Sequence, residues 1–254
     1  MNMKALQKDL LAVEIYETRA EMGAAAADRI KKKILSLLEE KDTVHMIFAA
    51  APSQNEVLAA LAEDKDIPWE RVIAFHMDEY IGLPENAPQS FGRFLREHLF
   101  SLIPLREVFY INGRAEDVEA ECKRYAALLA QYPTDIVIMG IGENGHVAFN
   151  DPPVADFADP CVAKQVMLDE VCRNQQVHDG CFPTLSDVPR AAITLTVPTL
   201  FAGKHLFCIV PAATKAEAVK GTLFGEITEA CPATVLRRHE SAVLFLDGDS
   251  SSLL

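Results

Sequence analysis

The alternation of short apolar runs with longer helical stretches constrains the fold of this chain most strongly. The runs are rich in Val, Ile, Phe and Met, as buried strands are, and comprise residues 43–49, 71–77, 108–111, 135–139, 191–196, 205–210 and 242–246. Strands that alternate with helices form parallel βαβ units, and uniformly apolar strands are covered on both faces. We therefore expect an α/β fold, a three-layer α/β/α domain with a mostly parallel, doubly wound sheet.

The helices that separate these strands carry recognisable start signals. Thr18 and Glu21 have the spacing of a capping box, which predicts a helix from there to about Glu40. Ser53 and Ser90 are each expected to cap a further helix. Residues 116–130 and 214–224 are also expected to be helical.

The segment 151–190 interrupts this regular pattern. It is rich in Pro, Asp, Gln and Gly and has little apolar periodicity. A long irregular insertion in an α/β domain is often a lid or a binding loop, and we expect that role here. No composition shift marks a domain boundary, so residues 1–254 are expected to form a single domain.

Composition and charge restrict the classes of partner. Half of the 254 residues are hydrophobic, which suffices for a core, and the net charge is −13. The acidic balance argues against a nucleic-acid partner, although a few local cations can still bind a small anion. The six cysteines show neither a C-x-x-C pair nor a zinc-like cluster, and no apolar run reaches the roughly 18 residues of a membrane span. We expect reduced thiols, no metal, no membrane contact and a cytoplasmic protein.

Three segments that follow predicted strands carry unusual polar residues. They are APSQNE (51–56), HMDEYIGLPENAPQS (76–90) and MGIGENGHVAFNDPP (139–153). Ligands of open α/β sheets bind at the carboxyl ends of the strands, so these segments are expected to converge on one site. The convergence is a stronger signal than any one of the three segments.

Each segment has a chemical and a purely structural interpretation. His146 follows three glycines and could move a proton, with Asn144 and Asp151 orienting its ring, or it could be a turn histidine bonded to backbone. Asp78 could act as a base at a strand end, or it could cap a turn. Ser53 at a helix N-terminus could help to bind a phosphate, or it could simply cap the helix.

Together the segments resemble one enzyme family. MDEYIGLPENAPQSF and GIGENGHVAFNDPP are similar to the two signature stretches of glucosamine-6-phosphate deaminases, and AECKRYAALL, VPRAAITLTVPTLFAGKHLF and TKAEAV follow in the family's order. The resemblance covers most of the chain and implies a modified Rossmann-like sheet. The related 6-phosphogluconolactonases share the fold and a GHxA-like turn, but they do not typically have MDEY followed by GLP.

The resemblance implies a role for each candidate residue. Asp78 would move a proton between C2 and C1 of the open-chain sugar, and His146, held by positions 144 and 151, would assist ring opening. Arg173 and Lys215 would match the family's phosphate-binding cations. No metal or organic cofactor is implied, because acid–base groups and fixed dipoles can handle an enediol or enolamine intermediate.

The sequence departs from the family pattern at three places. The phosphate loop lacks the usual glycines, so the side chains of Ser53, Gln54 and Asn55 would have to help bind the phosphate. Asn144 stands where the family has Asp, and Asp151 stands where it has Glu. An amide can fix the tautomer of His146 but cannot stabilise an imidazolium by charge.

The resulting expectation is an amino-sugar-phosphate aldose–ketose isomerase/deaminase. It would convert glucosamine 6-phosphate, or a related hexosamine 6-phosphate, to a ketose 6-phosphate and ammonia. One alternative is a 6-phosphogluconolactonase-like hydrolase in which His146 activates water, and another is a non-catalytic sugar-phosphate-binding homologue. The family includes monomers and hexamers, so a homo-oligomer stays open.

Overall fold

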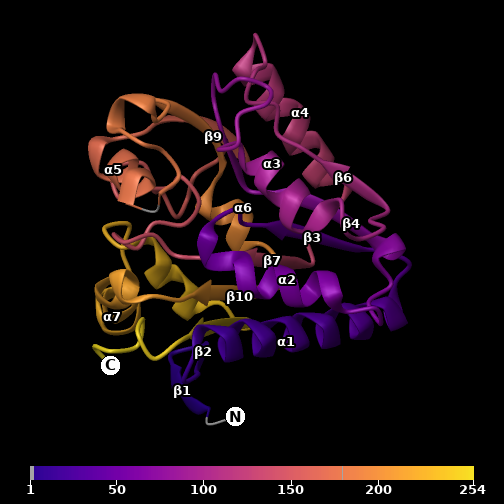
Figure 1. Ribbon diagram of the computed structural model, residues 1–254, viewed down its shortest axis with the longest axis vertical. Helices are drawn as coiled ribbons and strands as arrows, with labels where there is room; N and C mark the ends of the chain where they lie inside the picture. Colours follow the sequence, from indigo (N-terminus) through magenta and orange to yellow (C-terminus); the bar gives the residue numbers. More distant parts are fainter. Residues whose placement is uncertain (1–2, 179) are drawn as a thin grey trace.

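The computed structural model describes residues 3–178 and 180–254 and is built around one large sheet (Figure 1). The strand order is β1-β2-β11-β10-β7-β3-β4-β6, and every neighbouring pair is parallel except β1 and β2. The strands are β1 (Lys4–Lys8), β2 (Leu11–Ile15), β3 (Val44–Phe48), β4 (Val72–His76), β6 (Glu107–Phe109), β7 (Ile136–Met139), β10 (His205–Val210) and β11 (Ala242–Leu246). The predicted mostly parallel sheet is confirmed.

Helices cover both faces of this sheet. One face packs against α1 (Arg19–Glu40), α2 (Asn55–Glu63) and α3 (Phe91–Leu95), and the other against α4 (Val118–Gln131), α6 (Val197–Phe201) and α7 (Ala216–Phe224). Successive strand residues therefore enter different cores: in β3, Met46 joins the core under α1, whereas Ile47 joins the core under α4. The predicted three-layer α/β/α architecture follows from this alternation.

The predicted helix starts are confirmed at two of three positions. Thr18 and Glu21 form the capping box of α1, and the Ser90 side chain accepts a hydrogen bond from the Arg93 N–H at the start of α3. The prediction for Ser53 was wrong. A 3-10 turn, Pro52–Gln54, precedes α2, because the fixed φ of Pro52 suits a first helical position and starts the helical backbone before Ser53.

A second, smaller sheet lies beside the carboxyl edge of the main one. It consists of β5 (Asp78–Tyr80), β9 (Ala191–Leu195) and β8 (Ala163–Met167), in the order β5-β9-β8 and antiparallel throughout. The run 191–196, expected in the parallel sheet, is the central strand here. The chain passes directly from β4 into β5, and the Met77 carbonyl at this corner accepts a hydrogen bond from the Leu195 N–H at 2.8 Å.

The segment 151–190 is more regular than its composition predicted. It contains β8 and α5 (Glu170–His178), and it encloses a small apolar core of its own with Tyr80 and Phe149. In Figure 1 this part lies at the upper left, above α7. The expectation of an irregular insertion was wrong, because single apolar residues on β8 and α5, such as Val166 and Cys172, suffice to bury one face of each element.

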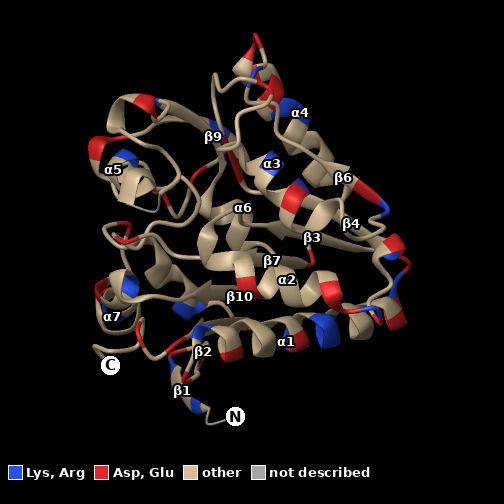
Figure 2. Cartoon of the chain, viewed as in Figure 1, with Lys and Arg blue, Asp and Glu red and all other residues tan. Residues whose placement is uncertain are grey.

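The described ranges contain no disulfide bond and no candidate metal site. All six cysteines are free thiols. Residues 3–178 and 180–254 contain no grouping of three or more His, Cys, Asp or Glu side chains that could hold a metal ion. In the same ranges, no helix combines the length and apolar character needed to cross a membrane. Residues of both charge signs are spread along the helices and the loops (Figure 2).

Candidate active site

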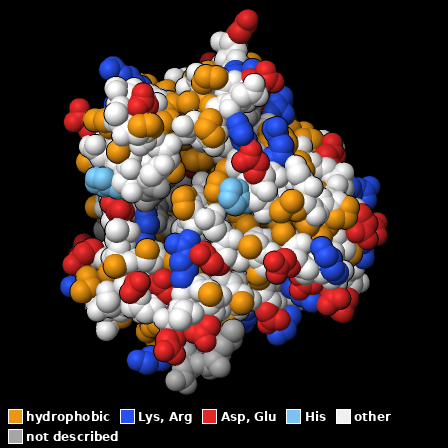
Figure 3. Space-filling model, viewed as in Figure 1, with side chains coloured by type: hydrophobic (Ala, Val, Ile, Leu, Met, Phe, Trp, Pro, Cys, Tyr) orange, Lys and Arg blue, Asp and Glu red, His pale blue; other side chains and the backbone are white. Residues whose placement is uncertain are grey.

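A hollow with about 920 Å³ of empty space, which includes solvent at its open mouth, lies at the carboxyl ends of β3, β4, β7 and β10 and at the first residue of β5. Figure 3 shows it as a depression in the left half of the molecule, with Lys and Arg side chains at its rim. All three polar segments identified in the sequence contribute to its lining, together with α5 and the start of α7. The predicted convergence at the strand ends is therefore present in the structure.

The predicted site residues divide into three groups. Five line the hollow: Ser53, Gln54, Asp78, His146 and Lys215. Asn144 and Asp151 do not line it but contact His146 from behind. Among the described residues, Asn55 and Arg173 are not part of the lining.

His146 is oriented by two neighbours. Its Nδ1 lies 2.8 Å from Asn144 Oδ1 and 3.1 Å from Asp151 Oδ1. The Asn144 amide also donates to Asp151 Oδ1 at 2.9 Å. Because both atoms facing Nδ1 are acceptors, Nδ1 carries the proton and Nε2 is left as the nitrogen that can accept one.

Asp151 supplies the charge that Asn144 lacks. Burial tends to raise the pKa of this carboxyl, but hydrogen bonds from His146 and Asn144 and the attraction of the imidazolium outweigh burial and lower it. The ionised carboxylate lies close enough to His146 to stabilise a proton on the ring. The substitution of Asp by Asn at position 144 therefore does not remove negative charge from the imidazole's surroundings.

The backbone around His146 explains two of the glycines in this stretch. A Cβ on Gly142 would lie 2.1–2.4 Å from three atoms of the His146 ring, so the ring packs directly on this glycine. Gly145 adopts a φ of 81°, which is accessible to glycine at little cost. Ala148 has a φ of 50° without being glycine, and such backbone strain tends to cluster at functional sites.

Asp78 is the carboxylate of the pocket. It is 7% exposed, and burial, followed by the negative charge of Glu79, raises its pKa well above the ordinary value. Glu79 points elsewhere, because its carboxylate accepts hydrogen bonds from the Ser90 hydroxyl at 2.8 Å and the Gly92 N–H at 2.9 Å. The two adjacent carboxylates thus have different roles: Asp78 lines the pocket and Glu79 anchors α3.

A fully buried histidine supports Asp78 from within the protein. His76 Nε2 accepts a hydrogen bond from the Ile111 N–H at 2.9 Å, so Nδ1 carries the proton and donates to the Asp78 carbonyl at 2.9 Å. The Tyr125 hydroxyl accepts from the His76 N–H and lies 2.8 Å from the His76 carbonyl. Burial lowers the pKa of His76 and keeps its ring neutral. The sequence indicates only that His76 ends a strand, although its position directly before MDEY is a signal for a role beside Asp78.

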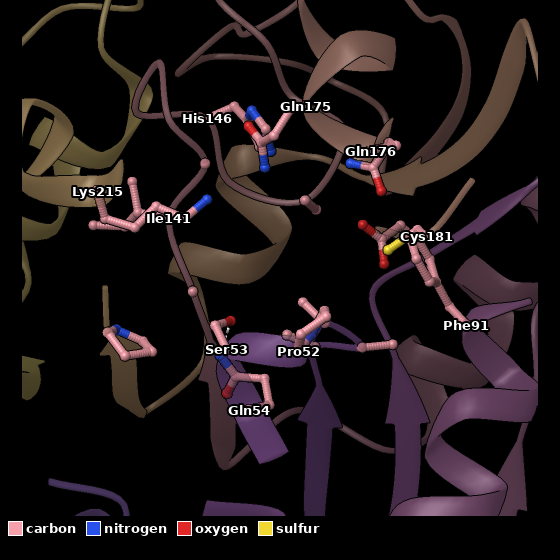
Figure 4. Close-up of a pocket in the computed structure, with 18 of the residues that line it drawn as sticks. Pro52, Ser53, Gln54, Phe91, Ile141, His146, Gln175, Gln176, Cys181 and Lys215 are labelled. Atoms are coloured by element: carbon pink, nitrogen blue, oxygen red, sulfur yellow. Dashed lines mark hydrogen bonds between the residues drawn. The ribbon is translucent and has the colours of Figure 1, made fainter. Parts of the chain in front are cut away.

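The opposite end of the pocket is suited to an anion. Lys215 is buried at the start of α7. The turn that leads to it contains Ala212, which has a φ of 82° and whose N–H donates to the Asp247 carboxylate. Gln54 is fully buried and donates to Ser53 Oγ at 3.0 Å and to the Ile209 carbonyl at 3.3 Å. Figure 4 shows Lys215 facing the cavity across from Phe91 and Cys181, with Ser53 and Gln54 between these two sides.

Two expected phosphate ligands need correction. The Arg173 guanidinium donates to the carbonyls of Val188, at 3.0 Å, and Leu185, and so ties α5 to the loop that follows it. These carbonyls belong to the 3-10 helix Leu185–Asp187 and its C-cap residue, and they bind the guanidinium in place of a phosphate. Asn55 is the first residue of α2, one position beyond the 3-10 turn that faces the pocket. Arg19, which sequence reasoning did not single out, lines the pocket instead.

Comparison with known proteins agrees with this geometry. The family model described as glucosamine-6-phosphate isomerases/6-phosphogluconolactonase matches residues 17–245. Glucosamine-6-phosphate deaminases of Bacillus cereus and Bacillus anthracis are each 36% identical over 245 residues, which is 96% of this chain and 88% of each relative.

Solved structures show the same relationship. A monomeric glucosamine-6-phosphate deaminase matches with a TM-score of 0.86 and 29% identity, covering 95% of this chain and 99% of that one. A 6-phosphogluconolactonase from Thermotoga maritima shares the fold, with a TM-score of 0.76 at 24% identity over 93% of this chain and 99% of its own. The chain therefore belongs to the glucosamine-6-phosphate isomerase/6-phosphogluconolactonase family.

Proposed function

We propose that the protein is an amino-sugar-phosphate aldose–ketose isomerase/deaminase. Its substrate is glucosamine 6-phosphate or a related hexosamine 6-phosphate, and its products are a ketose 6-phosphate and ammonia. The observation that carries the proposal is that Asp78, His146 and Lys215, from three separate segments, line one hollow of about 920 Å³. The relatives named glucosamine-6-phosphate deaminase support the choice of substrate.

His146 acts first, on the closed sugar. Its unprotonated Nε2 accepts the proton of the C1 hydroxyl, and the ring C1–O5 bond breaks as the aldehyde forms. The imidazolium then returns the proton to O5. Asp151, 3.1 Å from Nδ1, stabilises the transient positive charge on the ring.

Asp78 then moves a proton between adjacent carbons. Its carboxylate takes the C2 proton while a proton of the C2 ammonium group passes to the C1 oxygen, which gives a C1–C2 enolamine. The proton held by Asp78 is then delivered to C1. The C2 iminium that results adds water and releases ammonia, leaving the C2 ketone. A buried carboxyl with a raised pKa is a stronger base than an exposed one, which favours abstraction of a carbon-bound proton.

The test is exchange of the C2 proton with solvent deuterium. In Asp78→Asn the exchange and the ammonia release should both fall below detection, whereas the affinity for the sugar phosphate should stay within a few fold. Asp28→Asn, at an exposed residue of α1 paired only with the exposed Lys32 among the described ion pairs, is the matched control and should behave as the parent. Undiminished C2 exchange in Asp78→Asn would remove the residue from this role.

A substrate comparison separates the proposal from its alternatives. The purified protein is offered hexosamine 6-phosphates and, separately, a 6-phosphogluconolactone. Release of ammonia supports the deaminase, whereas lactone opening without ammonia release identifies a hydrolase. Binding of a hexosamine phosphate without turnover over hours identifies a non-catalytic homologue.

We also propose that residues 151–190 act as a lid within a single domain spanning residues 1–254. Gln175 and Gln176 of α5 line the pocket, and two hydrogen bonds fasten them: the Glu143 N–H donates to Gln175 Oε1 at 3.0 Å, and the Tyr80 hydroxyl donates to Gln176 Oε1 at 2.8 Å. Tyr80→Phe removes the second bond. It should increase amide hydrogen exchange in α5 in the free protein, and bound substrate should restore part of the protection.

A further inference from the structure

The structure assigns Arg19 as an anion-binding residue of the pocket, held in its binding position by Glu56. This inference rests on the proposed function for the identity of the anion, which is the phosphate of the sugar. Arg19 is the first residue of α1, and the capping box formed by Thr18 and Glu21 fixes the backbone there. Its side chain lines the pocket next to Ser53 and Gln54.

Two contacts fix the plane of the guanidinium. Arg19 Nη2 donates to the Pro52 carbonyl, and Arg19 Nε lies 2.6 Å from a carboxylate oxygen of Glu56. Arginine has five N–H donors in a rigid fork, so these contacts orient the group and leave donors for a ligand. An arginine prepared in this way can contact two phosphate oxygens at once.

A close helix–helix contact brings these groups together. At Gly23, one turn after Arg19, a Cβ would lie 2.4 Å from the Cβ of Glu56. The first turns of α1 and α2 therefore approach more closely than two side chains would allow. This approach places Arg19 within reach of Pro52, in the 3-10 turn that lines the pocket, and of Glu56 in the first turn of α2.

The loop itself needs such a cation. The run APSQNE has no glycine, so its backbone cannot wrap around a phosphate closely. Side chains must then supply the binding energy, and Arg19 and Lys215 lie at the same pocket as Ser53 and Gln54. Arg173, the cation expected from the sequence, is engaged by the carbonyls of Leu185 and Val188.

Gln54 provides an independent sign that a ligand belongs at this end. Its amide nitrogen donates to two protein acceptors, but its Oε1 is buried and has no hydrogen-bond partner among the residues that the structure describes. An unsatisfied buried acceptor is costly and calls for a donor. When the phosphate group lies between Arg19 and Lys215, a hydroxyl of the same sugar phosphate can donate a hydrogen bond to Gln54 Oε1.

The test combines inorganic phosphate binding with steady-state kinetics. Arg19→Gln should weaken the binding of inorganic phosphate by about 10- to 100-fold, since hydrogen bonds to charged groups contribute this much. It should raise KM for the sugar phosphate by a similar factor and leave kcat within about threefold. Arg19→Lys keeps the charge but not the fork and should fall between the two proteins.

Further variants separate binding from packing. Glu56→Gln should weaken phosphate binding by only a few fold, because it loosens Arg19 without removing its charge. Arg114→Gln, which alters an exposed arginine paired with Glu85 outside the pocket, should leave phosphate affinity unchanged. If Arg19→Gln lowers the thermal midpoint but binds phosphate as the parent does, Arg19 only joins α1 to the loop and the inference is wrong. Since phosphate binding needs no turnover, this result is independent of whether ammonia is released.

Discussion

Replacing Gly142 by alanine is the most direct test of how the site is built. The new Cβ would lie 2.1 Å from Cε1 of His146, whereas ordinary contact begins at 3.4 Å. The ring must therefore move by about 1.3 Å, the difference between these two distances. A displacement of about 1 Å in a catalytic group costs on the order of 10² in rate. We expect kcat to fall about 100-fold, which corresponds to about 2.7 kcal/mol of activation free energy.

The assay for Gly142→Ala is ammonia release at saturating hexosamine 6-phosphate, with inorganic phosphate affinity as a second measurement. Phosphate affinity should stay within a few fold, because the three atoms nearest to the new methyl group all belong to the His146 ring. Gly221→Ala is the matched control, since its Cβ would meet only Cys231 Sγ at 3.7 Å, and it should retain full activity. A Gly142→Ala protein with parental kcat would refute the idea that His146 needs its present position.

Three further changes have defined outcomes. Gly23→Ala should lower the free energy of unfolding by about 1–3 kcal/mol in chemical denaturation, because the methyl group pushes α1 away from α2. Tyr125→Phe removes the hydroxyl that bonds the backbone of His76, and it should lower kcat with little change in KM. A shifted pH profile of kcat would show that the effect reaches Asp78. A loss of stability with unchanged kcat would contradict this prediction. Asp135 is fully buried, and its carboxylate accepts hydrogen bonds from Lys41, Lys204 and the His45 N–H. Burial tends to raise the pKa of this carboxyl, but the three partners outweigh burial and lower it. Asp135→Asn should therefore cost about 2–3 kcal/mol of stability at pH 7. The difference from the parent should begin to shrink below about pH 4, where the unfolded chain takes up a proton at this position, and should disappear as the pH falls through the lowered pKa of the folded protein.

The main sheet could be predicted because its strands are short, apolar and separated by helices. The run 191–196 shows the limit of this reasoning. AITLT is as apolar as the parallel strands, yet it pairs antiparallel with β5 and β8, and periodicity alone cannot identify a strand's partners. β8 was missed for the opposite reason: in its sequence AKQVM only Ala163 and Val166 are buried, so it contains no apolar run and looks like a loop.

The site could be predicted as far as local sequence determines it. His146, Asn144 and Asp151 lie within eight residues, and their contacts follow from one glycine-rich turn. The phosphate end could not be predicted in the same way. Arg19 comes from the first helix and reaches the pocket only because α1 packs on α2 at a glycine, which is a tertiary contact that no motif reports.

The small sheet that carries Asp78 has a consequence for how the protein folds. β8 and β9 lie close in the sequence, but β5 starts at position 78 and its partner β9 starts at position 191, so this pair forms across more than a hundred residues of intervening chain. Chain closure over such lengths slows folding, whereas the βαβ units on either side form from nearby residues. The acid–base centre is therefore complete only after this long-range pairing, and we expect refolding followed by activity to lag behind refolding followed by helix content.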